Sequence, residues 1–238
     1  MSLLWAWIGA AFATPLNPGL HTLTIHSATR AKIPFFGWTP SVTRSVVLIN
    51  LAQTDGEWRQ THTVCDIQID TKRIPVRTII PKAFVQALPI KQYSIQIEET
   101  ANGLSYSAYL GIDNVGMRPE ASAVPTHADH PDVVDMEGDG HPGATVHVKV
   151  PMFRMAHLYV SQRSSLQLNG FIQSDGSVEG RVFLGPTVQH TLDASNLLLK
   201  SSPPIQPDAE KSWFRLTSYD GLPTCEAVIS DPKSMYRG

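Results

Sequence analysis

The sequence predicts an all-β fold, either an antiparallel β-barrel or a β-sandwich, with one short helix and one long irregular loop. Hydrophobic residues recur at every second position along much of the chain, which is the period of a strand with one buried face. Turn formers are abundant, with 16 glycines and 18 prolines in 238 residues. Short strands joined by many turns fit this composition, and a sheet of this size has to close or cover its edges.

The strands are expected in a regular succession. Segment 45–51 is apolar without alternation, as in a strand that is covered on both faces. Asn-Gly at 102–103 and Asp-Gly at 175–176 lie between alternating runs, so each is expected to form a hairpin turn. Two sets of residues are each expected to share a face of the sheet: Thr63, Cys65, Ile67 and Ile69 in one strand, and Leu104, Tyr106, Ala108, Leu110 and Ile112 in another.

One segment has the pattern of a helix. Pro81 occupies a first-turn position, and Phe84, Ala87 and Leu88 follow at helical spacing before Pro89, which predicts about two turns over 81–88. The long loop is expected at 113–143, where apolar periodicity is lost. Loops longer than about 12–15 residues tend to be functional or disordered.

The amino terminus is an uncharged apolar run that ends in Ala11-Phe12-Ala13, the pattern of a secretory signal peptide. We therefore expect residues 1–13 to be removed and 14–238 to form a single β-domain in a secreted or periplasmic protein. The alternative is a first buried element of a cytosolic protein. The run is too short to span a membrane, which takes about 20 apolar residues.

Two cysteines, Cys65 and Cys225, are present. In an oxidising compartment they are expected to form one disulfide bond. The alternative is a pair of buried free thiols.

An acidic motif supplies the main functional signal. Asp135, Glu137 and Asp139 alternate ahead of Gly140 and His141, and a loop with acids at positions 1, 3 and 5, glycine at 6 and a carbonyl at 7 can bind Ca²⁺. The segment resembles the D-x-D-x-D-G loops of EF-hands and dockerins. The resemblance implies side-chain ligation by the three acids and carbonyl ligation by His141. Glu at position 3 and Val146 at position 12 depart from the EF-hand pattern, and a plain acidic turn is the alternative.

Other residues of the long loop offer weaker candidates. His127, Asp129, His130 and His141 could form a zinc site, or they could be solvated loop residues. Asp129 and Asp132 could instead add oxygen ligands to the calcium site. The net charge is −2 and no Lys/Arg cluster exceeds Lys72-Arg73, which argues against nucleic acid and anionic membranes as partners.

The function expected from these observations is a binding or cell-envelope-associated module with a structural calcium ion. The chain contains no G-x-S-x-G, P-loop, H-E-x-x-H or C-x-x-C motif, so an enzyme is less favoured but stays open. One alternative is an extracellular hydrolase with a calcium-ordered active-site loop, which requires a His within hydrogen-bond reach of a Ser, Asp or Glu. The other is a lipocalin-like carrier, which requires an interior cavity of about 300 Å³ or more lined by Leu, Ile and Val.

Overall fold

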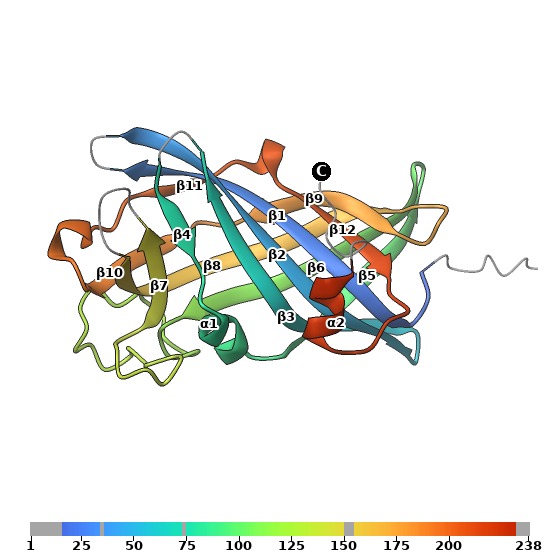
Figure 1. The fold of residues 1–238 in the computed structure, drawn as a ribbon. Coiled ribbons are helices and arrows are strands. Elements are labelled where there is room, and N and C mark those ends of the chain that lie inside the picture. Colours follow the sequence, from blue (N-terminus) through green and yellow to red (C-terminus); the bar gives the residue numbers. More distant parts are fainter. Residues whose placement is uncertain (1–15, 34–35, 73–74, 150–154, 232–238) are drawn as a thin grey trace, which may run out of the picture.

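The fold is a single antiparallel sheet of twelve strands (Figure 1). The computed structural model describes residues 16–33, 36–72, 75–149 and 155–231. The expected all-β fold is therefore confirmed. The expected signal peptide, residues 1–13, lies outside the described residues.

The strands vary widely in length, because some cross the whole molecule and others extend only one end of it. They are β1 (Gly19–Ile33), β2 (Gly37–Thr54), β3 (Glu57–Thr71), β4 (Arg77–Ile79), β5 (Lys91–Thr100), β6 (Gly103–Val115), β7 (Ala144–Lys149), β8 (Ala156–Ile172), β9 (Val178–Leu184), β10 (Val188–Ala194), β11 (Ile205–Pro207) and β12 (Trp213–Ser218).

Eight of these strands form a closed ring. Their order is β8-β6-β5-β3-β2-β1-β12-β9, and pairing between β8 and β9 closes it. Both predicted hairpin turns are present, with Thr100 opposite Gly103 and Ile172 opposite Val178. Closure pairs the edges that an open sheet would expose, so the fold is a barrel and not a two-layer sandwich.

The barrel wall changes composition along its length. One half of β8 pairs with β6 and β9, whereas the other half pairs with β7 and β10. Beyond the ends of β5 and β6, the gap between β3 and β8 is filled by β4, β7 and helix α1 (Lys82–Ala87). In Figure 1 this end, with β4, β7 and β10, lies at the left, and the β5–β6 and β8–β9 turns project at the right.

Two β-bulges split the two residue sets that were expected to share a face, so these assignments are wrong beyond each bulge. The register of β3 against β2 shifts at Cys65, so Cys65 packs outside the barrel while Val64, Ile67 and Ile69 face its interior. The register of β6 shifts between Tyr109 and Ile112. An extra residue in one strand reverses the side-chain alternation beyond it.

The second bulge also determines where two further residues point. It includes Gly111, whose φ of 72° favours glycine. Ile112 is consequently 49% exposed, and Asp113 faces the interior of the barrel. β6 continues to Val115, so the first three residues of the expected loop at 113–143 belong to a strand.

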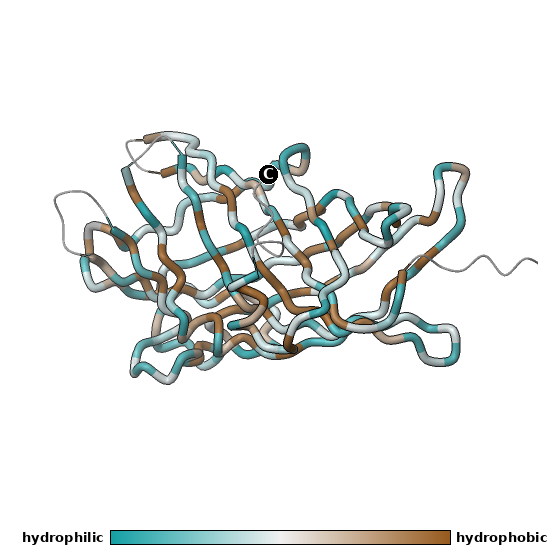
Figure 2. Tube along the Cα trace, turned by 45° about the vertical axis from the view of Figure 1, so that its right-hand side comes forward, coloured by the Kyte–Doolittle hydropathy of each residue, from teal (hydrophilic) through white to brown (hydrophobic). Residues whose placement is uncertain are grey.

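The apolar core fills one end of the barrel. Its largest members are Trp58, Tyr106 and Phe214, and the Tyr106 hydroxyl donates to Gln60 Oε1 at 2.7 Å. Figure 2 shows hydrophobic residues concentrated along the strands and hydrophilic residues in the projecting turns. Strand β2 is covered on both faces as expected, because Val47 and Ile49 face the core and Val46 and Leu48 pack outside.

The helix predicted at 81–88 is observed as α1, with Pro81 preceding its first turn. A second helix that was not predicted, α2 (Cys225–Ser230), packs on the outer face of β2 and β3. It is joined there by the Cys65–Cys225 disulfide, whose Cα atoms are 4.9 Å apart. No helix in the described part of the chain is long and apolar enough to cross a membrane.

Candidate functional site

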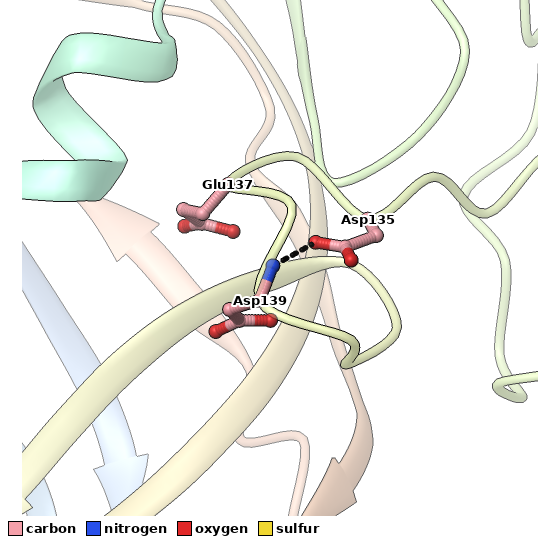
Figure 3. Close-up of side chains that lie close together, drawn as sticks. All are labelled: Asp135, Glu137 and Asp139. Carbon is pink, nitrogen blue, oxygen red and sulfur yellow. Dashed lines mark hydrogen bonds between the residues drawn. The ribbon is translucent and has the colours of Figure 1, made fainter.

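The acidic loop leads directly into strand β7, beside helix α1 (Figure 3). Its backbone is held at both ends, because the Met136 amide donates to the Gly143 carbonyl and the Gly143 amide donates to the Val134 carbonyl. Gly140 has a φ of 83°, as the sixth position of the calcium motif requires. The loop therefore has a defined turn and is not an extended linker.

The three predicted carboxylates come together. Asp135, Glu137 and Asp139 each place an oxygen within 4.8 Å of the others. Asp135 is the organising residue: its Oδ1 accepts from the amides of Gly138 and Asp139, and its Oδ2 accepts from that of Gly140. Burial acts to raise the pKa of Asp135, but these amide hydrogen bonds outweigh it and hold the pKa below its usual range.

The other two carboxylates attach the loop to β7 through one residue. Glu137 Oε1 accepts from the Thr145 amide at 3.0 Å, and Asp139 Oδ2 accepts from the Thr145 hydroxyl at 2.7 Å. Glu137 Oε2 is buried without a hydrogen-bond partner among the described residues. Burial raises the pKa of Glu137, and the charges of Asp139 and Asp135 act in the same direction. A cation beside these oxygens would lower the cost of keeping all three acids ionised.

The histidines of the long loop do not join this group. Within the described residues, the triad is the one set of acids, histidines or cysteines spaced to hold a metal ion. His127 Nε2 instead lies 3.9 Å from Asp129 Oδ1, and His130 Nδ1 lies 3.9 Å from Asp132 Oδ2. The zinc alternative therefore finds no support. The His141 ring stacks on Tyr159 and its amide donates to Asp139 Oδ1. Ligation by the His141 carbonyl stays a prediction.

A second candidate site is a cavity of about 490 Å³ inside the barrel. It occupies the end formed by β4, β7, β10 and α1, next to the apolar core. Its volume is within the range of small-molecule sites, about 300–1,000 Å³. This end of the barrel is therefore not filled by side chains.

The walls of the cavity differ in chemistry. On the side of β3, β7 and β8 it is lined by aliphatic side chains, which include Val64, Ile67, Ile69, Val146, Val148 and Leu158. On the side of β1 and β2 it is lined by hydroxyl groups, which include Ser27, Thr29, Thr43 and Ser45. Strands β2 and β8 are four places apart in the ring of eight, so the hydroxyl groups of β2 lie opposite β8, whereas the aliphatic residues of β3 lie beside them.

A small polar cluster lies where the cavity adjoins the core. It comprises His62 of β3 and residues of β5, the strand paired with β3. The Tyr93 ring of β5 is in edge contact with the His62 ring, with 4.8 Å between the ring centroids. Lys91 forms an ion pair with Asp113. His62 is only 6% exposed, and burial lowers its pKa to about 3. Burial, and then the charge of Asp113, raise the pKa of Tyr93. Both rings are therefore uncharged at neutral pH.

Sequence reasoning found the acidic triad but not the polar cluster. His62 sits in an alternating run and was assigned no role. The available signal was that Trp58, Gln60, His62 and Val64 share the face that carries the core tryptophan, which places two polar side chains inside the barrel.

Comparison with known proteins adds no further assignment. A scan against family models gave no match, and a search of curated proteins found no relative.

Proposed function

We propose that this protein is a carrier that binds one small, largely apolar molecule inside its barrel. The cavity of about 490 Å³ is the observation that supports this function most directly. Barrels of eight strands are either filled by side chains or able to hold one small ligand. The core fills one end here, and the aliphatic wall supplies the apolar surface that a ligand would cover at the other.

The acidic loop is proposed to hold one structural Ca²⁺ ion. Three clustered carboxylates and a glycine turn support a hard cation with oxygen ligands. Through Thr145 the loop is hydrogen-bonded to β7, whose next residue, Val146, lines the cavity. A bound ion would stabilise the cavity wall. Without a bidentate acid at position 12, the dissociation constant is expected in the range of about 10⁻⁴–10⁻³ M.

Export to an oxidising compartment is part of the proposal. The Cys65–Cys225 disulfide supports it, because such bonds form and persist mainly outside the reducing cytosol. The signal-like sequence of residues 1–13 points the same way.

The hydrolase alternative has less support. No hydrogen bond joins a histidine ring to a serine hydroxyl within the described ranges. Of the His–Asp pairs of the long loop, His127–Asp129 is exposed and His130–Asp132 is half-exposed, with 3.9 Å between the nearest nitrogen and oxygen in each. A nucleophile and base within hydrogen-bond reach are the structural signature of covalent catalysis.

Fluorescence titration with N-phenyl-naphthylamine tests the carrier function, since this apolar probe brightens on leaving water. The protein is expected to bind one probe, and Ile67→Trp, which places an indole in the cavity, should weaken binding by more than about tenfold. Gln68→Trp adds the same ring at the exposed neighbouring position and should bind like the wild type. Equal binding by all three proteins would place the probe elsewhere, and no binding would reject the carrier function.

A further inference from the structure

The polar cluster of the cavity has hydrogen-bonding capacity that the protein does not use. Neither ring nitrogen of His62 forms a hydrogen bond with a described residue, and its Nε2 is buried. The Tyr93 hydroxyl also makes no hydrogen bond with a described residue. Buried polar groups are nearly always paired, so the unpaired His62 ring, in edge contact with Tyr93 in the cavity wall, points to a ligand that pairs with it.

We propose that the ligand is an uncharged long-chain alcohol, whose hydroxyl group binds His62 and Tyr93 and whose hydrocarbon chain lies along β3, β7 and β8. This inference rests on the carrier function proposed above and adds the chemical class of the ligand.

The absence of charge follows from the groups around the head. Lys91 and Asp113 both line the cavity and neutralise each other. A carboxylate ligand would have to compete with Asp113 for Lys91 and would lie close to a like charge. An ammonium ligand would have to compete with Lys91 for Asp113 and would lie close to the like charge of Lys91. Burying an unpaired charge in an apolar site is far more costly than burying a hydroxyl.

The hydroxyl group follows from the chemistry of the two rings. A neutral imidazole has one donor and one acceptor, and a phenol can both donate and accept. An alcohol hydroxyl also donates and accepts, so it can accept from one ring and donate to the other. Burial lowers the pKa of His62 to about 3, so the ring is neutral and this arrangement would hold across the physiological pH range.

The length of the chain follows from the volume. At roughly the 30 Å³ that one water molecule occupies in the liquid, the cavity of about 490 Å³ takes about sixteen groups of that size. Dodecanol fits within this limit. Its chain would cover Val64, Ile67, Val146 and Val148, which contribute apolar surface and no hydrogen-bonding groups.

Displacement of N-phenyl-naphthylamine by three probes with equal carbon chains tests the inference: dodecanol, dodecanoate and chlorododecane. Wild-type protein is expected to bind dodecanol about tenfold more tightly than chlorododecane. The hydrogen bonds of the hydroxyl group are expected to contribute about 1.4 kcal/mol, which corresponds to a tenfold difference in the dissociation constant. His62→Phe and Tyr93→Phe keep ring shape and should each reduce this preference to about twofold. Tyr109→Phe, on the exposed outer face of β6, is the matched control and should keep it. Thermal melting of each variant shows that it is folded.

The outcomes separate the inference from the function on which it rests. Tightest binding of dodecanoate would show that Lys91 selects an acid and would overturn the inference. Equal displacement by all three probes, unchanged in His62→Phe and Tyr93→Phe, would also overturn it while leaving the carrier function in place. Failure of every probe to bind, with Ile67→Trp indistinguishable from wild type, would reject the carrier function itself.

Discussion

Burial of a neutral His62 predicts that His62→Phe removes part of the acid sensitivity of the fold. The folded-state pKa of His62 is about 3, against 6.5 for an ordinary histidine. Between these values the unfolded chain takes up a proton that the folded protein does not, so stability falls as the pH falls. Above pH 6.5 the effect is absent, and below about pH 3 it is complete. Phenylalanine keeps the ring and carries no titratable group.

The size of the effect follows from the two pKa values. Each pH unit within this window removes about 1.4 kcal/mol, so about 2 kcal/mol is lost between neutral pH and pH 5. The assay is urea unfolding of both proteins at pH 7.5 and pH 5. His21, His26 and His147, whose pKa values burial also lowers, are present in both proteins, so their contribution cancels in the difference. Parallel stability profiles for wild type and His62→Phe would refute the assignment of a buried, neutral ring.

Three further predictions concern the acidic loop, the disulfide and a close backbone contact. Asp135→Ala with Asp139→Ala should abolish the calcium-dependent rise in melting temperature, about 1.4 kcal/mol at tenfold excess over the dissociation constant, whereas Asp175→Ala in the β8–β9 turn should keep it; calorimetry showing no calcium effect on wild type would reduce the loop to an acidic turn. Cys65→Ser with Cys225→Ser should lower the unfolding free energy by about 5 kcal/mol in the chain-entropy description of a 160-residue separation, measured by urea titration; a loss below about 1 kcal/mol would contradict it. Gly143→Ala should cost more than about 2 kcal/mol, because φ is 84° and a Cβ would lie 2.5 Å from the Val160 carbonyl oxygen, whereas Gly138→Ala, also at positive φ but in open space, should cost only about 1 kcal/mol; equal melting temperatures of the two variants would argue against the close contact.

Local patterns were sufficient to predict much of the fold. Alternation identified the strands, Asn-Gly and Asp-Gly identified the hairpins, and Pro81 identified the start of α1. These signals depend on a few neighbouring residues. The bulges at Cys65 and Gly111 do not, because an extra residue in one strand is defined by its pairing partner. Face assignments beyond each bulge were therefore wrong.

The two parts of the site differ in the same way. Asp135, Glu137 and Asp139 lie within five residues of each other, so their spacing was enough to predict a cluster of oxygen ligands. His62, Tyr93 and Asp113 come from the neighbouring strands β3, β5 and β6, whose pairing register brings them together, and closure of the ring encloses the cavity around them. Ring closure depends on pairings between distant segments, such as β1 with β12. The sequence pattern does not indicate which residues of such strands lie opposite each other.

The location of a bound ligand tests the carrier function most directly. A crystal structure of the protein with an ω-brominated dodecanol would place the bromine by its anomalous scattering. We expect a single bromine inside the barrel, near Val146, Val148 and Leu158, with the hydroxyl group at His62 and Tyr93. A bromine on the concave outer face near Phe171 and Phe183, with no ligand density inside the barrel, would contradict it.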